Sequence, residues 1–139
     1  MAENAKTPRP VYRNIHVTDL ANYRLPPAGF VSILHRISGA IMFLLMPFII
    51  WMFDTSVSSE ISFDEFTSVF GGDFGWFFKL LALGLIWGYL HHFISGVRHL
   101  IMDATHTVSK EQGKSSAIVT LVLGTGLTLV LALKLFGVF

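Results

Sequence analysis

Three long apolar stretches constrain what this chain can fold into more than any other feature. Residues 37–53, 80–97 and 115–133 contain no aspartate, glutamate, lysine or arginine. A helix needs about 20 residues to cross the hydrocarbon core of a bilayer, and each stretch reaches that length once its flanks are included. The sequence therefore predicts an all-α integral membrane protein. Its three transmembrane helices are expected at roughly 30–53, 76–102 and 115–137.

The composition favours a membrane protein over a soluble helical bundle. Charged residues make up 14% of the chain, whereas soluble domains carry about 25%. We expect one membrane domain, residues 30–139, after a polar N-terminal tail, residues 1–29, that lacks the features of a cleavable signal. The chain has no cysteine, which excludes a disulfide, an iron–sulfur cluster ligated by this chain and covalently attached c-type haem.

The distribution of lysine and arginine predicts an orientation, because these residues favour the cytoplasmic side of a membrane. The tail and the loop before the third span are basic through Lys6, Arg9, Arg13, Arg24, Lys110 and Lys114. Residues 54–75, between the first two spans, hold five acidic residues and no lysine or arginine. We therefore expect a cytoplasmic N-terminus, with the acidic loop and the C-terminus on the other side. No basic stripe suggests a nucleic-acid partner.

The second span carries polar residues on one face, although ionisable groups are costly inside a bilayer. These residues are His92, Gly96, His99 and Asp103. Their spacings of four, three and four positions place them on the same side of a helix. His35 and Arg36 of the first span lie at the same end, because the two helices are antiparallel. This convergence favours a cofactor or proton pathway, and the alternatives are an arginine that reaches the headgroups and histidines that are merely hydrogen-bonded.

The chemistry of these residues suits haem. A buried neutral imidazole is a natural axial ligand of haem iron, and His92 is the deepest histidine of the face. Gly96, one turn away, would leave room for a flat macrocycle. Arg36, together with His35 or His99, could pair with the haem propionates.

Three further features concern packing. Pro47 lies inside the first span and should kink it. In the acidic loop, Phe63, Phe66 and Phe70 follow Ser62 at helical spacing, which fits either a short amphipathic helix on the membrane surface or a loop packed against the helix ends. The third span has a small residue at every fourth position, which lets another helix approach closely, in this chain or a partner. These residues are Ser116, Thr120, Gly124, Thr128 and Ala132.

The two polar clusters also carry a family resemblance. The stretch "SILHRISG" in the first span and "HHFISGVRHLIMD" in the second resemble the cytochrome b556 membrane-anchor family of succinate dehydrogenase, in which the anchor of this type is the larger of two. The tail "RPVYRNI" and the loop segment "TSVSS" are similar too. The resemblance covers nearly the whole chain, including the three-span layout.

This resemblance implies a subunit of succinate:quinone oxidoreductase, the respiratory complex II of electron transport and the tricarboxylic acid cycle. In the family, a flavoprotein oxidises succinate and an iron–sulfur subunit passes the electrons on. Two three-span anchors form a shared helical bundle that binds one haem b and ubiquinone, so this chain would supply half of that bundle. It would have no catalytic activity alone, and membrane lipid would surround it.

The resemblance also assigns roles to individual residues. His92 matches the family's axial haem ligand, since Gly96 and Arg98 fix the register, and His91 is the neighbouring alternative. The second axial ligand would come from the partner anchor. The family's quinone-site serine and arginine correspond to Ser32 and Arg36.

The remaining matches lie around the same pocket. The resemblance implies that His35, Arg36 and His99 line it or hold the propionates, and that Asp103 is placed to relay protons from water. A bacterial inner membrane is expected, with a mitochondrial inner membrane less favoured. Two other functions stay open: a fumarate reductase anchor that oxidises menaquinol, and a haem-free membrane adaptor that only docks soluble subunits.

Overall fold

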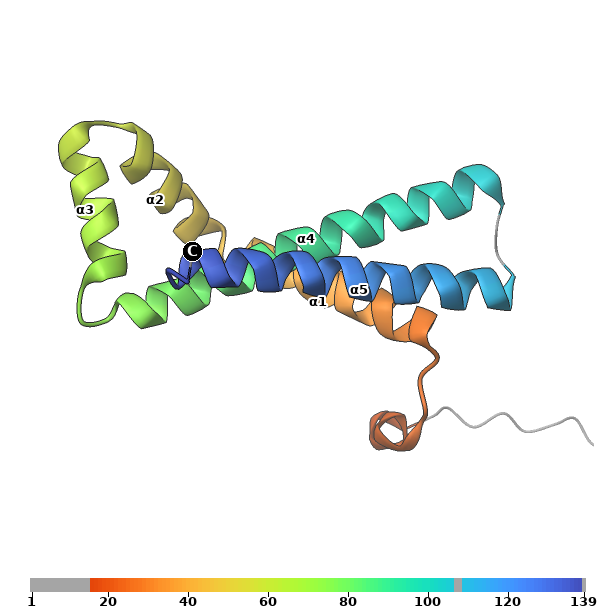
Figure 1. The fold of residues 1–139 in the computed structure, drawn as a ribbon. Helices are drawn as coiled ribbons and strands as arrows, with labels where there is room; N and C mark the ends of the chain where they lie inside the picture. The colour runs from red at the N-terminus through yellow and green to blue at the C-terminus, as the bar shows by residue number, and fades with distance from the viewer. Residues whose placement is uncertain (1–15, 107–108, 139) are drawn as a thin grey trace, which may run out of the picture.

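The computed structural model describes residues 16–106 and 109–138, and this part of the chain is helical without any strand. The elements in chain order are η1 (Val17–Asn22), α1 (Pro27–Leu44), α2 (Met46–Val57), α3 (Glu60–Gly71), α4 (Gly75–Thr105) and α5 (Lys110–Leu135). Helices α1, α4 and α5 pack against one another. Helices α2 and α3 form a hairpin at one end of this group, and the start of α1 and the α4–α5 connection lie at the other end (Figure 1).

The three packed helices are long and apolar enough to cross a membrane. They contain 18, 31 and 26 residues for α1, α4 and α5. At 1.5 Å per residue, α1 is about 27 Å long, close to the hydrocarbon thickness of about 30 Å, and α4 extends well beyond it. The expected all-helical membrane protein with three spans is confirmed.

The first span is shorter than the sequence predicted. The sequence predicted one kinked helix over 30–53, but α1 ends at Leu44 and α2 begins at Met46 after a break at Leu45, which has φ −90° and ψ 7°. Pro47 lies in the first turn of α2, where its missing N–H costs nothing. A proline ring also clashes with the carbonyl four residues earlier, so it interrupts a helix that would otherwise continue. The predicted kink is therefore a break, and α2 turns away from α1 (Figure 1).

The acidic loop contains a helix, as one of the two alternatives proposed. This helix, α3, begins at Glu60 rather than after Ser62, because Ser59 caps it and Ser62 completes the capping box. Phe66 and Phe70 pack into an aromatic cluster that also includes Trp51 of α2 and Phe78 of α4. This cluster ties the hairpin to the start of α4. A position of α3 on the membrane surface stays a prediction.

The contacts among α1, α4 and α5 depend on small and polar residues. The buried side chains of these helices include Ser38, His91, Ser95, Arg98 and Thr120, whereas many of their large apolar side chains are exposed. Gly88 lies against α1, and a Cβ added at Gly124 would stand 3.6 Å from Nδ1 of His91. The small-residue ladder of α5 therefore packs on α4 of the same chain. Membrane helices associate in this way because lipid already surrounds their apolar surface.

The N-terminal tail is described only in part. Residues 1–15, with the basic residues Lys6, Arg9 and Arg13, lie outside the described residues. Residues Val17–Asn22 form a short 3-10 helix. Pro26 precedes the first turn of α1 with extended backbone, and Pro27 is the first residue of that helix.

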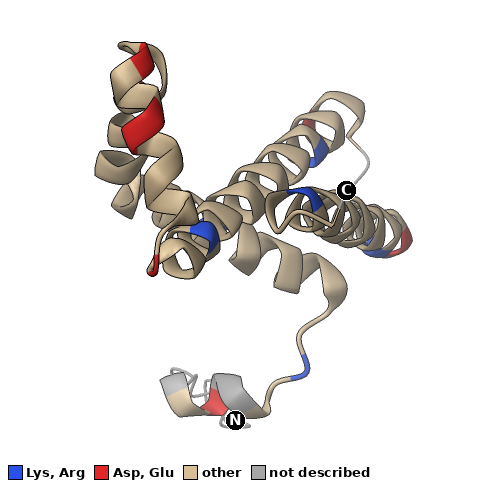
Figure 2. Cartoon of the chain, turned by 60° about the vertical axis from the view of Figure 1, so that its left-hand side comes forward, with Lys and Arg blue, Asp and Glu red and all other residues tan. Residues whose placement is uncertain are grey.

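The positions of the charges allow a test of the orientation. Figure 2 shows acidic residues gathered on α3 and long uncharged lengths of helix elsewhere. Single cysteines replacing Asp64 in α3 and Lys110 at the start of α5 should label from opposite sides. In intact cells an impermeant thiol reagent should reach position 64 but not 110, and the absence of native cysteine removes background labelling. Labelling at 110 and not at 64 would reverse the predicted orientation.

Candidate functional site: a histidine cluster between α1 and α4

Three histidines from two helices meet at one place. The ring centroid of His35 in α1 lies 4.1 Å from that of His92 and 5.3 Å from that of His99, both in α4. Because His92 and His99 are seven residues apart, they lie two turns apart on one face of α4, and His35 lies between them. The structure thus brings together three of the polar residues that the sequence placed at the same end of the bilayer.

Gly96 has a different neighbour from the one expected. The sequence suggested that its missing side chain would admit a flat macrocycle. In the structure the nearest atom to a Cβ added at Gly96 is Nε2 of His35, at 3.9 Å. The imidazole of His35 in α1 therefore lies at ordinary contact distance from this position. Room for a flat macrocycle beside Gly96 stays a prediction.

The hydrogen bond of His92 fixes which ring nitrogen carries the proton. Its Nδ1 lies 3.0 Å from the backbone carbonyl oxygen of His35. A carbonyl oxygen only accepts hydrogen bonds, so Nδ1 must donate and the neutral ring keeps its lone pair on Nε2. His92 is half-buried, and in its neutral form the ring nitrogen without a proton is Nε2.

Two residues next to His35 shape the space around His92. The hydroxyl of Ser38 donates to the same His35 carbonyl at 2.8 Å and lies 3.3 Å from Nδ1 of His92. A Cβ added at Gly39 would stand 3.0 Å from Cε1 of the same ring. Both residues lie in the quoted "SILHRISG" stretch, but the sequence analysis did not single them out. The available signal was their position one turn after His35.

His35 has an unusual polar atom. Its Nε2 is buried and has no hydrogen-bond partner among the described residues. Buried polar atoms are almost always paired, so such an atom indicates a group that the chain alone does not supply. A carboxylate or an ordered water would satisfy it. The side chains of His35, His92 and His99 do not by themselves form a metal-ion site. Within residues 16–106 and 109–138, no group of three or more histidine, aspartate and glutamate side chains could hold a metal ion.

His91 has different neighbours from His92. It is 2% exposed, its Nε2 lies 3.3 Å from the hydroxyl of Ser95, and its ring stacks on Trp87. It also lies next to Gly124 of α5 and to the backbone of Val31 in α1. Consecutive residues in a helix point about 100° apart, which explains why the two adjacent histidines have separate surroundings. His91 is enclosed among the three packed helices.

The other predicted site residues lie nearby but are not joined to the cluster. Ser32 is half-buried and Arg36 is exposed, one turn apart on α1, and Asp103 is exposed near the end of α4. No ion pair links Arg36 to Asp103 within the described segments. The structure therefore brings His35, His92 and His99 together and leaves the hydroxyl, guanidinium and carboxylate groups unengaged at the same end of the helices.

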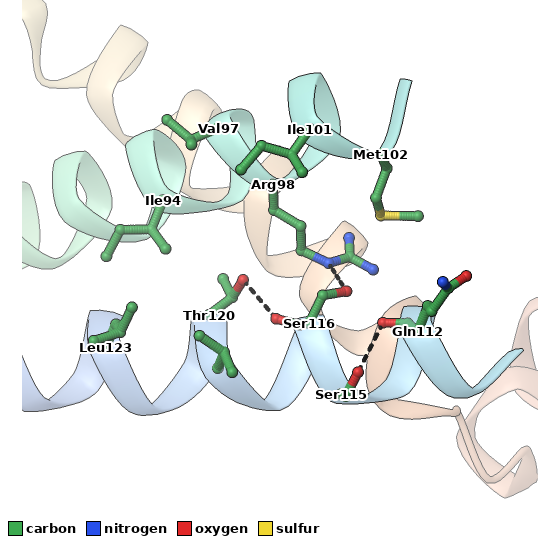
Figure 3. A pocket seen from close by; sticks show the side chains of 11 residues that line it. Ile94, Val97, Arg98, Ile101, Met102, Gln112, Ser115, Ser116, Thr120 and Leu123 are labelled. Atoms are coloured by element: carbon green, nitrogen blue, oxygen red, sulfur yellow. Dashed lines mark hydrogen bonds between the residues drawn. The ribbon is translucent and has the colours of Figure 1, made fainter. Parts of the chain in front are cut away.

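Arg98 connects α4 to α5. Its Nε donates to the hydroxyl of Ser116 at 2.9 Å, and its Nη2 donates to the carbonyl of Gly113 at 3.2 Å. Figure 3 shows this side chain reaching across the helices at one end of a mainly apolar groove of about 480 Å³. None of the clustered histidines lines the groove. Arg98 is thus a helix–helix contact rather than part of the histidine cluster.

Replacing Arg98 with methionine should loosen the contact between α4 and α5. Methionine keeps similar bulk but offers no donor, and hydrogen bonds from a charged group contribute about 1.5–3 kcal/mol each. We expect a lower melting temperature of the purified complex. Ser116→Ala should have a smaller effect, and Lys114→Met, which removes an exposed charge from α5, should have almost none. An Arg98→Met protein as stable as the unmodified one would show that these bonds do not hold the helices together.

The comparisons with known proteins agree with this architecture. Residues 8–133 match the model of the family described as succinate dehydrogenase/fumarate reductase transmembrane subunit. The chain is 33% identical over 105 residues to the succinate dehydrogenase cytochrome b556 subunit of Coxiella burnetii, covering 76% of this chain and 82% of that protein. It is 30% identical to the subunit of the same name from Paracoccus denitrificans, over the full length of both. The chain therefore belongs to the family of transmembrane subunits of succinate dehydrogenase and fumarate reductase.

Proposed function

We propose that this chain anchors a succinate dehydrogenase in the membrane, supplies one axial ligand to haem b, and forms part of the site that reduces ubiquinone. The observation that carries the proposal is the geometry of His92. Its Nδ1 donates to the His35 carbonyl, so that Nε2 of the neutral ring carries the lone pair. The two relatives named as cytochrome b556 subunits support a haem protein of the succinate dehydrogenase type.

The residues of the cluster fit haem. Histidine ligands of metals almost always donate their other ring N–H to a carbonyl, carboxylate or water, which holds the ring in place and raises the basicity of the ligating nitrogen. His92 has such a partner before any metal is bound. The orphaned Nε2 of His35 and the half-buried His99 are placed to hold propionate groups, with Arg36 at the same end of the helices. A haem bound here would store and pass single electrons.

The quinone part of the proposal depends on Ser32, Arg36 and Asp103. Reduction of a quinone to a quinol requires two electrons, two protons and groups that hold the carbonyl oxygens. Ser32 offers a hydroxyl donor, and Arg36, one turn later on the same side of α1, offers a fixed positive charge. Asp103 is exposed near the end of α4, where it can exchange protons with water.

The proposed assembly follows from what the chain leaves uncovered. Many large apolar side chains of α1, α4 and α5 are exposed, and these helices form half of a bundle when a second three-span anchor packs on them. That anchor would supply the second axial ligand, and an iron–sulfur subunit and a flavoprotein would dock at the cytoplasmic end. We place the complex in a bacterial inner membrane, with the N-terminus in the cytoplasm and residues 30–139 as the membrane domain.

Replacing His92 with alanine should abolish the low-spin haem spectrum of the assembled complex. The reason is that no other accessible imidazole of α4 carries a fixed Nδ1–H bond that frees its Nε2. A reduced-minus-oxidised difference spectrum of the purified complex measures the haem directly.

His91→Ala is the matched control, because it removes the adjacent imidazole from the enclosed α4–α5 contact. It should leave the haem spectrum close to normal while lowering stability. If His91→Ala lost its haem and His92→Ala kept it, the axial ligand would be His91 instead of His92. If the unmodified complex assembled and oxidised succinate but contained no haem, that result would favour the adaptor function instead.

Replacing Arg36 with leucine should slow succinate-driven quinone reduction. A lost hydrogen bond to a charged group costs about 1.5–3 kcal/mol, which corresponds to roughly one to two decades in rate if the bond forms as charge develops. Ser32→Ala should act in the same direction more weakly. Succinate oxidation with an artificial dye acceptor should stay near normal, because that reaction occurs in the soluble subunits.

Lys110→Leu serves as the control for a general loss of positive charge at this membrane face, and it should affect neither activity. Equal loss of quinone reduction and dye reduction in Arg36→Leu would indicate failed docking of the soluble subunits. No change in either activity would mean that Arg36 only contacts lipid headgroups. Faster menaquinol oxidation than succinate oxidation would identify a fumarate reductase anchor.

A further inference from the structure

Two residues position the side chain of His92, and the proposed function assigns no role to either of them. Ser38 is fully buried, and its hydroxyl donates to the His35 carbonyl at 2.8 Å. The same carbonyl accepts the Nδ1–H of His92 at 3.0 Å. One oxygen therefore receives hydrogen bonds from both helices, and the hydroxyl and the imidazole compete for it.

Gly39 leaves space for the same ring, which a side chain at this position would restrict. A Cβ there would stand 3.0 Å from Cε1 and 3.4 Å from Nδ1 of His92. Real Cβ contacts are rarely this short, so the ring would have to move by a few tenths of an ångström if Gly39 gained a side chain. The imidazole thus lies directly on the backbone of α1. Glycine at 39 permits this approach, and serine at 38 sets the hydrogen bonding beside it.

We infer that Ser38 and Gly39 are positioning residues for His92, and that together they set the orientation of its imidazole and the strength of its Nδ1–H bond. The inference rests on the proposed role of His92 as a haem ligand. A hydrogen bond donated by the non-ligating nitrogen makes the imidazole a stronger electron donor to the iron. Such bonds are one of the means by which a protein sets the reduction potential of a haem.

The competition for the His35 carbonyl gives the direction of the effect. The Ser38 bond, at 2.8 Å, has the ordinary length of a hydroxyl donor, whereas the 3.3 Å separation of Ser38 Oγ from Nδ1 lies beyond the usual range. The hydroxyl therefore acts mainly by occupying the carbonyl. Without it, the carbonyl would accept more strongly from Nδ1–H, His92 would donate more electron density to a ferric iron, and the midpoint potential of the haem would fall.

The test is a redox titration with low-spin EPR on the intact purified complex carrying Ser38→Ala or Gly39→Ala. Ser38→Ala should lower the haem midpoint potential, and Gly39→Ala should move the EPR g-values, because the imidazole must shift. Ser95→Ala is the control for the first, since Ser95 is equally buried but contacts His91. Gly84→Ala is the control for the second, since a Cβ at Gly84 meets nothing within 4 Å. Both controls should match the unmodified complex.

An unchanged or raised potential in Ser38→Ala would overturn the inference, and so would an equal shift in Ser95→Ala. If Gly39→Ala fails to assemble, the Ser38→Ala variant still tests the inference. Serine and alanine differ little in size, so we expect this variant to assemble. His92→Ala separates the two proposals. If that variant loses its haem while Ser38→Ala has normal spectra and potential, only the positioning role fails. If His92→Ala keeps its haem, or the unmodified complex has none, the proposed ligand fails and the positioning role fails with it.

Discussion

The backbone carbonyl of His35 is the acceptor on which the site between α1 and α4 depends. It receives a hydroxyl from its own helix and an imidazole N–H from the facing one. In a bilayer, a polar group without a partner costs several kcal/mol, because no water is present to replace the lost bond. This requirement fixes the rotation of His92 and its tautomer together. The lone pair of the neutral His92 ring therefore lies on Nε2, the nitrogen that we propose as the haem ligand.

The need to pair polar groups within the bilayer also explains why polar side chains lie between α1, α4 and α5 while apolar side chains cover their outer surface. Arg98 connects α4 to α5 through Ser116 and the Gly113 carbonyl, and His91 pairs with Ser95 beside Gly124. These contacts hold the three spans together without a core of large apolar residues. They leave the apolar surface for lipid and for a partner. Among the residues that the structure describes, one buried side-chain atom stays unpaired, Nε2 of His35, and it lies at the proposed haem site.

The sequence predicted the parts of this structure that depend on the bilayer and on helical periodicity. Runs of apolar residues predicted three spans because the thickness of a membrane sets their length. The seven-residue spacing of His92 and His99 predicted their shared face, and the antiparallel spans predicted that His35 lies at the same end of the helices. These properties follow from one helix at a time or from the direction of the chain.

The features that the sequence analysis missed depend on how neighbouring helices fit. The break at Leu45 and the helix starting at Glu60 depend on local backbone geometry and on an aromatic cluster drawn from three helices. The neighbour of Gly96 and the contact of Gly39 with His92 depend on the register between α1 and α4. Only the fold shows that His91 lies beside Ser95, Gly124 and Val31, whereas His92 bonds to the His35 carbonyl. No periodicity in a single span carries that information.

A density map of the intact complex, resolved well enough to separate side chains, would show the proposed ligand directly. We expect haem iron bonded to Nε2 of His92, with Nδ1 of the same ring still donating to the His35 carbonyl. We also expect a polar group of the haem or an ordered water to pair with Nε2 of His35. An iron bonded to His91, or a His92 ring turned away from that carbonyl, would contradict the proposed role of His92.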